Sequence, residues 1–304
     1  MVKIIENLTE YDSFINSFSS DPDFSDPHLS AKMKAGGELK DFLSDPCNHC
    51  FGVVNSAGVC GLFVFLLIPE EKYAEMLVGL TRDPDAAEEM LAYLETNYAG
   101  YAADFVMNPR HHILRGSLAK RGADLEPEQQ RMEYTHKATE CGLEGIEYLS
   151  SEYVDQYLDM HAEDVYWTGE RVIEAADRFK TLIALENGIV AGYLDVTYCY
   201  DVNEPFDLFV KPEYRRKGYA RKLLTKALLD NEPKDMMLLV DVGNLPAIKL
   251  YESTGFVKKE NGNMLAARWN IAASSWIEAD PASARANLHN TNEVTNELQS
   301  TVHP

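Results

Sequence analysis

The second half of the chain alternates short apolar runs with turns that contain glycine or proline. Residues 179–185 and 189–200 are rich in Ile, Val, Leu and Tyr, and the Asn187-Gly188 pair between them is typical of a tight β-hairpin. This pattern predicts two antiparallel strands. The same composition predicts four further short strands in this half, at residues 146–149, 206–210, 236–242 and 264–269.

Helical spacing of apolar residues follows three of these strands. One segment covers residues 151–163, and another is bounded by Asn244 as its cap and by Gly255 just beyond its end. The third has an apolar face made of Leu223, Leu224, Ala227 and Leu228. Strands that alternate with helices predict an α/β (α+β) domain over residues 141–271.

The first 140 residues repeat this plan in a weaker form. Strands are expected at 51–54 and 59–67, again joined by a short polar turn, and the segment 118–122 matches 251–255 in the register of its helix and closing glycine. We therefore predict an internal duplication, with domains at 1–140 and 141–271. The remainder, 272–304, is rich in Ala, Ser, Asn and Thr and is predicted to be a mobile or loosely helical tail.

Composition changes this picture mainly through charge. The 304 residues include 49 acidic and 28 basic ones, a formal net charge of -21, which repels nucleic acids and anionic membranes and attracts cations such as amines. The amino terminus lacks the pattern of a signal peptide, and no apolar run is long enough to span a bilayer. We therefore expect a cytoplasmic protein with no nucleic-acid and no membrane partner.

Cysteines indicate neither disulfides nor a metal. There are five, an odd and scattered set, which favours a reducing compartment. Cys47 and Cys50 have a spacing compatible with zinc, but a structural site usually needs a second ligand pair, and none stands out. No bound metal is expected.

The turn from Arg215 to Ala220 is the most informative segment. A strand that enters a glycine-containing turn and then a helix directs several unpaired backbone N–H groups at one point, which suits a pyrophosphate. Gly218 and Ala220 are small where the main chain must approach phosphate closely, and five cations surround them in an otherwise acidic chain: Arg215, Arg216, Lys217, Arg221 and Lys222. A basic patch for nucleic acid would not need this spacing and would oppose the net charge.

A second segment runs from Asn244 to Phe256. On a helix, Asn244, Ala247 and Tyr251 share one face, so that an amide, a small residue and a phenol line a groove. In acyl transfer from a thioester the departing thiolate benefits from a proton donor, and a phenol with a pKa near 10 can serve. Tyr251 is the candidate acid.

These two segments together resemble the GNAT superfamily of acyl-CoA-dependent N-acyltransferases. Residues 215–220 match its R/Q-x-x-G-x-G/A motif, with Ala220 in place of the usual second glycine, and residues 244–256 match its N-x-x-A-x-x-x-Y-x-x-x-G-F segment. The resemblance covers residues 145 to 270 and implies two GNAT-like domains, each a mixed, mostly antiparallel sheet flanked by helices.

The resemblance also implies roles for individual residues. The pyrophosphate loop falls on Arg215, Arg216, Lys217, Gly218, Tyr219 and Ala220. The family's splayed fourth strand falls on Leu208, Phe209 and Val210, whose amides would hold the acetyl carbonyl and the pantetheine arm of acetyl-CoA. Asn244 would contact the cosubstrate, and Tyr251 would protonate its thiolate.

The sequence does not decide which group is the general base. The family often uses a glutamate on the fourth strand, and counting back from Arg215 reaches Glu204, with Asp207 as the second choice and water as the third. A carboxylate can take the proton that an incoming ammonium must lose before its nitrogen attacks.

The amino-terminal copy departs from the family pattern where chemistry would need it. Residues 81–86 stand in the place of the phosphate turn but include no glycine and two acidic groups, and Leu118 occupies the place of Tyr251. We therefore predict a degenerate domain.

We expect an N-acetyltransferase that takes an amine-bearing, small-molecule acceptor in a ternary complex, as a monomer or homodimer. A non-catalytic acyl-CoA sensor is the alternative, and the acidic charge disfavours a nucleic-acid regulator.

Overall fold

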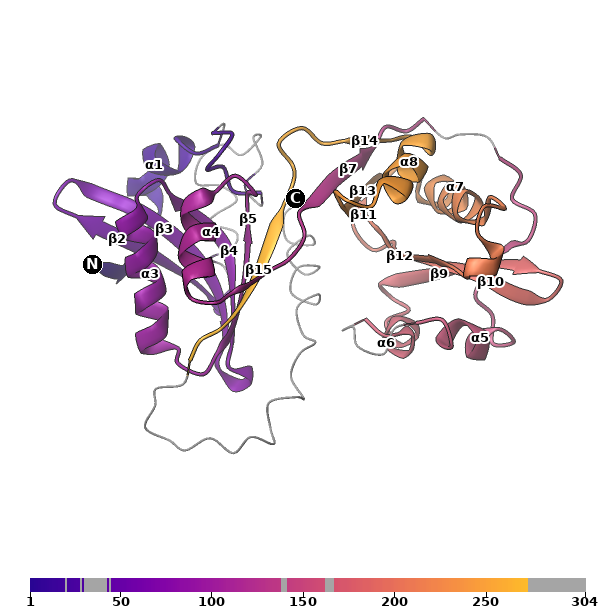
Figure 1. The fold of residues 1–304 in the computed structure, drawn as a ribbon, viewed down its shortest axis with the longest axis horizontal. Helices are drawn as coiled ribbons and strands as arrows, with labels where there is room; N and C mark the ends of the chain where they lie inside the picture. Colours follow the sequence, from indigo (N-terminus) through magenta and orange to yellow (C-terminus); the bar gives the residue numbers. More distant parts are fainter. Residues whose placement is uncertain are drawn as a thin grey trace. The chain divides into compact units, whose positions relative to one another are not determined.

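The computed structural model describes residues 1–19, 21–27, 29, 43, 45–137, 141–161 and 167–272. These residues form two compact units, one made of residues 1–129 and 260–272, the other of residues 130–259 with the gaps given above (Figure 1). The predicted tail from residue 273 on, and the end of the helix predicted at 151–163, lie outside the described residues. Within these ranges, no helix is both long and apolar enough to cross a membrane.

The first unit is built on a seven-stranded sheet in the spatial order β1-β2-β3-β4-β5-β15-β6. Neighbouring strands are antiparallel, except that β4 and β5 run parallel. The strands are β1 (Val2–Ile4), β2 (Asn48–Asn55), β3 (Gly58–Ile68), β4 (Tyr73–Thr81), β5 (Ala102–Met107), β15 (Leu265–Asn270) and β6 (Asp124–Leu125).

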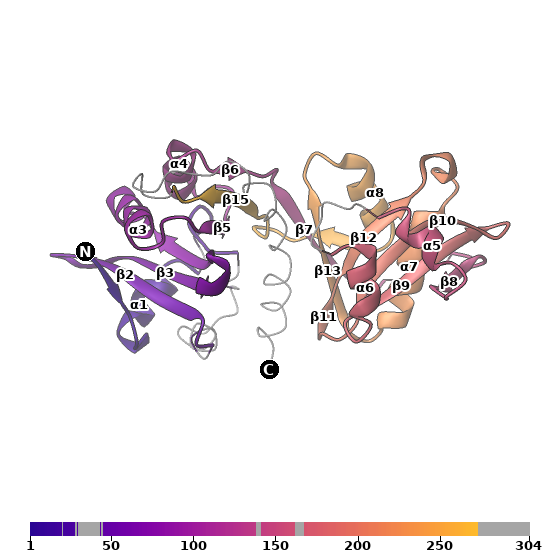
Figure 2. The ribbon, with the colours of Figure 1, turned by 90° about the horizontal axis from the view of Figure 1, so that it is seen from below.

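Helices cover both faces of this sheet. The apolar sides of α3 (Pro84–Asn97) and α4 (His112–Lys120) pack on one face, and α1 (Asp12–Asn16) lies on the other (Figure 2). Two short 3-10 helices, Thr9–Tyr11 and Pro69–Glu71, complete the unit. Cys50 belongs to its core, where burial raises the pKa of the thiol to about 12, so Cys50 is a poor source of the thiolate that a metal would need.

The last strand does not lie where the sequence predicts it. Residues 265–270 pair with β5 and β6 of the first unit, whereas β7 (Gln129–Tyr134), which precedes residue 141, pairs with β14 of the second. The boundaries at 140 and 271 are therefore wrong: the chain passes between units near residues 129 and 260. The first unit completes its sheet with β15, which follows the second unit in the sequence, and β7 belongs to the second unit although it precedes residue 141.

The pairing of β15 with β5 predicts which strands lose stability when a side chain of β15 is removed. The buried indole of Trp269 packs 6.3 Å from the ring of Phe105 on β5, so Trp269→Ala should destabilise the first unit by about 3–5 kcal/mol. Hydrogen exchange followed by mass spectrometry should show faster exchange in β5 and no change in β7. The control Val257→Ala, on an exposed position of the second unit, should change neither. Faster exchange in β7 would contradict the strand assignment.

A second prediction concerns a buried carboxyl pair in the first unit. Burial, and then the charge of Asp104, raise the pKa of Glu75 to about 8, and burial raises that of Asp104 to about 6. Because the folded state holds the Glu75 proton more tightly than the unfolded chain, the free energy of unfolding should fall as pH rises from about 4.5 to 8.

Glu75→Gln should remove the part of this fall that belongs to Glu75, roughly 3 kcal/mol between pH 5 and pH 9 in urea unfolding, and leave the smaller part below about pH 6 that belongs to Asp104. The exposed Glu10→Gln is the matched control and should keep the parent's pH dependence. Equal pH dependence of the parent and Glu75→Gln would show that this carboxyl is not the cause.

The second unit consists of two four-stranded sheets, in the orders β12-β10-β9-β8 and β11-β13-β7-β14. Their remaining strands are β8 (Ile146–Tyr148), β9 (Phe179–Glu186), β10 (Ile189–Thr197), β11 (Val202–Asn203), β12 (Pro205–Val210), β13 (Asp235–Asp241) and β14 (Phe256–Lys258). The predicted hairpin is present: β9 and β10 are antiparallel, and both turn residues have positive φ angles of 54° and 77°.

Helices pack on both faces of the sheet that contains β10. The apolar face of α7 (Tyr219–Asn231) covers one side, while α5 (Val154–Leu158) and α6 (Gly169–Glu174) cover the other (Figure 1). A 3-10 helix, Pro212–Tyr214, precedes α7, and α8 (Leu245–Ser253) follows β13. The predicted fold class, mixed α/β with mostly antiparallel sheets flanked by helices, is confirmed. Hairpin, strand, helix, strand and helix occur in the same succession in both units.

Candidate active site

Two sheets of the second unit separate at Glu204. Just before it, Val202 and Asn203 pair in parallel with the start of β13. Just after it, β12 pairs only with β10, and β12 is the edge strand of its sheet. A β-bulge accompanies the change, since Phe206 is an extra residue opposite the step from Asp195 to Val196. Within the described chain, the far edge of β12 therefore carries no strand.

Two backbone amides of β12 point into this opening. The N–H of Lys211 donates to the carbonyl of Ala191 on β10 at 2.9 Å, and alternation along the strand then directs the amides of Leu208 and Val210 away from β10. The carbonyl of Val210 also faces outward, where it accepts from Arg215 Nε at 2.9 Å. The Phe209 amide, in contrast, faces β10, so of the three predicted residues only two offer N–H groups to a ligand.

The predicted phosphate turn has an unusual backbone. Arg216 and Gly218 both have positive φ angles, 67° and 89°, which aims successive amides inward. Gly218 is the N-cap of α7 and provides no side-chain cap, while the first helical hydrogen bond runs from Lys222 N to Gly218 O. The amides of Tyr219, Ala220 and Arg221 thus lack intrahelical partners and stand at the positive end of the helix.

Space and charge at the turn suit an anion. A Cβ at Gly218 would meet no atom within 4 Å, so the position is open to a ligand. Arg215 and Lys217 are engaged with Val210 O and with Glu186, the latter at 2.9 Å. Arg216 is exposed and, among the described residues, has no acidic partner. The turn combines free amides with an uncommitted guanidinium, the donor set that phosphate prefers.

On α8, the predicted face is formed as expected. The side chain of Asn244 caps the helix by accepting from Ala247 N at 3.2 Å, which leaves its amide N–H groups for a ligand. Tyr251 is half-buried, and its hydroxyl has no hydrogen-bond partner in the described chain. Burial, and then the charges of Asp207 and Glu204, raise the pKa of this phenol to about 12.

Both candidate bases therefore lie near Tyr251. Glu204 is half-buried at the point where the sheets separate, and its backbone is fixed by two hydrogen bonds to Thr197, of 2.8 and 3.0 Å. Asp207 lies three residues further on, accepts from the hydroxyl of Tyr193 at 2.6 Å, and has 44% of its side chain exposed. The candidate amides and Asp207 belong to β12, Glu204 directly precedes it, and the charges of both carboxylates act on the phenol of Tyr251.

A polar cluster beside β12 was not predicted. Asp195 lies in the middle of the apolar strand β10, is completely buried, accepts hydrogen bonds from Tyr157 and Thr181, and lies 3.0 Å from Nε2 of His161. The available signal in the sequence was a single acidic residue inside a run of apolar ones. Its partner His161 lies 34 positions away, and no local pattern connects the two.

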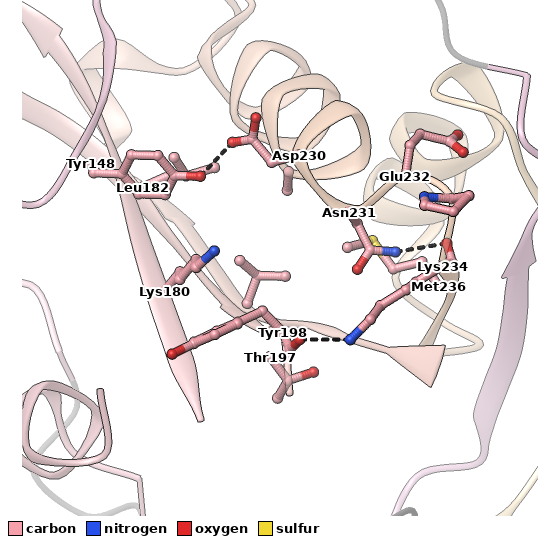
Figure 3. Close-up of a pocket in the computed structure, with 13 residues that line it drawn as sticks. Tyr148, Lys180, Leu182, Thr197, Tyr198, Asp230, Asn231, Glu232, Lys234 and Met236 are labelled. Atoms are coloured by element: carbon pink, nitrogen blue, oxygen red, sulfur yellow. Dashed lines mark hydrogen bonds between the residues drawn. The ribbon is translucent and has the colours of Figure 1, made fainter. Parts of the chain in front are cut away.

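A separate cavity of about 190 Å³ lies at the other end of α7 from the phosphate turn (Figure 3). Its polar groups are largely paired with one another. Asp230 accepts from Tyr148 at 2.6 Å, and Lys234 Nζ donates to the carbonyl oxygens of Tyr198 and Tyr200. The cavity therefore does not belong to the site around β12.

The corresponding edge in the first unit is filled by its own chain. β4 pairs with β5 only up to Met76, and in the unpaired part the amide of Gly79 donates to the buried carboxylate of Asp26 at 2.8 Å. Arg82, at the end of this strand, binds Asp21 at 2.6 Å. In the first unit, a carboxylate of the same chain thus accepts the hydrogen bond of a strand amide, whereas the outward amides of β12 in the second unit are left for a ligand.

Comparisons with known proteins cover the segment that contains this site. Residues 146–256 match the family model described as Acetyltransferase (GNAT) family. Spermidine N(1)-acetyltransferase of Vibrio cholerae is 30% identical over 113 residues, which are 36% of this chain and 61% of that protein. The chain thus spans about three fifths of the length of this curated relative.

Two solved structures share the fold. A GCN5-related N-acetyltransferase from Sphaerobacter thermophilus aligns with a TM-score of 0.61 at 13% identity, over 92% of this chain and 97% of its own. The GCN5-related glucosamine N-acetyltransferase region of a fungal multi-domain β-N-acetylglucosaminidase aligns with a TM-score of 0.54 at 10% identity, over 88% of this chain and 38% of its own. At such identities the likeness concerns architecture alone.

Proposed function

We propose that the second unit, whose residues 146–256 match the model of the Acetyltransferase (GNAT) family, transfers an acetyl group from acetyl-CoA to a primary amine. The observation that carries the proposal is the turn at Gly218, where three helix-start amides without intrahelical partners lie beside an open position and beside Arg216, which has no acidic partner among the described residues. We expect this turn to hold the pyrophosphate of acetyl-CoA, a substrate of the reaction.

The free edge of β12 supplies the other contacts. The amides of Leu208 and Val210 would hold the pantetheine arm and the acetyl carbonyl oxygen, with Asn244 as a further contact from α8. When an amine attacks the thioester carbon, negative charge develops on that oxygen, and one well-placed N–H donor stabilises it by roughly 3 kcal/mol.

Proton transfer would involve the groups around Tyr251. The ammonium loses one proton to Glu204, Asp207 or water, the free amine attacks in a ternary complex, and the C–S bond breaks as the C–N bond forms. Tyr251 protonates the departing thiolate and is reprotonated from the nitrogen through solvent. Part of the rise in the pKa of Tyr251 comes from the two carboxylates, so protonation of one of them makes the phenol a stronger acid when it must donate.

The acceptor class follows from charge. A net charge of -21 and two carboxylates near Tyr251 favour a cation, and the similarity to a spermidine acetyltransferase makes polyamines the first amines to test. The alternative is a non-catalytic module that binds acyl-CoA as a sensor, since the turn at Gly218 and the free edge of β12 would bind the same molecule in either case.

One assay separates these two functions. The full chain is incubated with acetyl-CoA and a panel of amines, including polyamines, and free thiol is followed. The proposal predicts thiol release that depends on both the amine and the protein, together with an acetylated amine detected by mass spectrometry. Saturable CoA binding without thiol release for any amine would favour the sensor.

A further inference from the structure

The buried cluster on β10 is attached to the candidate site through Asp207. His161 is almost fully buried, with 4% of its side chain exposed, and its Nε2 lies 3.0 Å from Asp195 Oδ2. Its ring stacks on Tyr193 at 4.4 Å between centroids and meets Tyr157 edge-on at 4.7 Å. The imidazole is therefore held in one orientation by packing as well as by a hydrogen bond.

The hydrogen bonds around Asp195 define the tautomer of this histidine. Besides His161, the hydroxyl of Tyr157 lies 3.0 Å from each carboxylate oxygen, and the hydroxyl of Thr181 lies 2.5 Å from one of them. Burial raises the pKa of Asp195, and the hydrogen bonds from His161, Thr181 and Tyr157 act against that rise. Because Tyr157 and Thr181 are both donors, we assign Asp195 as the acceptor and place the hydrogen of His161 on Nε2. The other nitrogen, Nδ1, is then a bare lone pair, and it has no hydrogen-bond partner in the described chain.

Asp207 is the residue that faces this lone pair. Its Oδ2 lies 4.0 Å from His161 Nδ1, so a shift of about 1 Å by the half-exposed carboxylate would bring the two atoms to hydrogen-bond distance. The charge of Asp207 also raises the pKa of Tyr251 on α8. Asp207 thus connects the open edge of β12 with the buried imidazole.

A metal ion is a less suitable occupant of this cluster. Donor atoms of His161, Asp195 and Asp207 do lie within 4.8 Å of one another. Both oxygens of Asp195, however, already accept hydrogen bonds from neighbouring side chains, and His161 spends Nε2 on one of those bonds. A cation would have to displace these donors, whereas a proton needs only the free Nδ1.

We propose that Asp207, His161 and Asp195 form a proton relay for amine acetylation, an inference that rests on the proposed function. Asp207 contacts the ammonium and accepts its proton, which then moves from the Asp207 carboxyl to Nδ1 of His161. The imidazolium donates from Nε2 to Asp195 and returns the proton to solvent through Asp207 after the acetylated product leaves. This choice makes Asp207, rather than Glu204, the base.

Other charged or titratable groups face the imidazole from each neighbouring element. Tyr193 comes from β10, Tyr157 from α5 and Glu170 from α6. Hydrogen bonds with its own backbone and with Thr168 lower the pKa of Glu170, and the charge of His161 adds a smaller effect. The two tyrosines have pKa values raised by burial and then by negative charge, so both phenols stay neutral during the transfer.

The pH dependence of kcat/KM tests the relay. Asp207→Asn should lower kcat by about 100-fold or more at neutral pH. His161→Gln should lower kcat about 10-fold and change the acid limb of the profile, because the proton on Asp207 then has no further acceptor in the relay. A role for His161 in packing alone would lower the rate equally at every pH, and that result would overturn the proposal.

A matched control is available within the same unit. His136 also lies between two carboxylates, 3.1 Å from Glu232 and 2.8 Å from Asp235, but it is half exposed and not part of the machinery around β12. His136→Gln should keep the parent's profile. Affinity for CoA, measured for each variant, should stay within about threefold of the parent and so confirms that the groove is folded.

The tautomer of His161 gives a test that needs no amine substrate. Nitrogen-15 NMR of the imidazole rings in the full chain, assigned with His161→Gln, should show Nε2–H with an unprotonated Nδ1 at the alkaline end of the titration. The opposite tautomer would overturn the relay even in an active enzyme. If the expected tautomer is found but no amine is acetylated, the proposed function fails while the geometry of the relay stands.

Discussion

Replacing Gly218 by glutamate is expected to weaken CoA binding by at least about 100-fold. The position has a φ of 89°, which disfavours any side chain, and the new carboxylate would stand where a phosphate is held, so repulsion replaces charge-assisted hydrogen bonds. A loss of about 3 kcal/mol corresponds to this change in Kd. Isothermal titration calorimetry of the full-length variant against the parent measures it.

Gly100 offers a matched control for backbone strain and added charge. Its φ is 83°, and a Cβ there would also meet no atom within 4 Å, but it lies in the first unit. Gly100→Glu should leave the affinity for CoA within about twofold of the parent. If Gly218→Glu binds CoA as tightly as Gly100→Glu does, the turn before α7 does not hold the pyrophosphate.

Substituting Tyr251 by phenylalanine is expected to lower kcat by about 100- to 1000-fold while the affinity for CoA is kept. The hydroxyl has no hydrogen-bond partner in the described chain, and Tyr251 is half-buried, so its loss costs little stability. The thiolate, in contrast, would depart without a nearby proton. Steady-state thiol release at saturating amine measures the effect.

Tyr148 is the control for this phenol. Burial, and then a hydrogen bond to Asp230, raise its pKa to about 12, as in Tyr251, but Tyr148 lines the separate cavity of Figure 3. Tyr148→Phe should turn over at the parent rate. If Tyr251→Phe does so as well, the phenol is not the acid, and water must protonate the thiolate.

Local chemistry explains which features could be predicted from sequence. The Asn187-Gly188 turn, the cap by Asn244 and the positive φ at Gly218 each depend on a few neighbouring residues, and all three occur in the structure. The succession of strand, turn and helix around residues 206–231 follows from the same short-range rules.

Long-range pairing explains what could not be predicted. The apolar pattern of residues 265–270 correctly indicates a strand, but nothing in that pattern states that its partners are β5 and β6 rather than strands of the second unit. The contact between Asp195 and His161 likewise joins positions 34 residues apart. The amide of Phe209 was misassigned because the bulge and the register with β10 are set by the sheet as a whole.

Titration of the full chain with coenzyme A tests the central claim most directly. The account predicts saturable heat with one CoA bound per chain, at the second unit, because Asp26 occupies the corresponding amide in the first. It also predicts a rise in the unfolding temperature as CoA is added. Absence of both heat and thermal shift at millimolar CoA would contradict it.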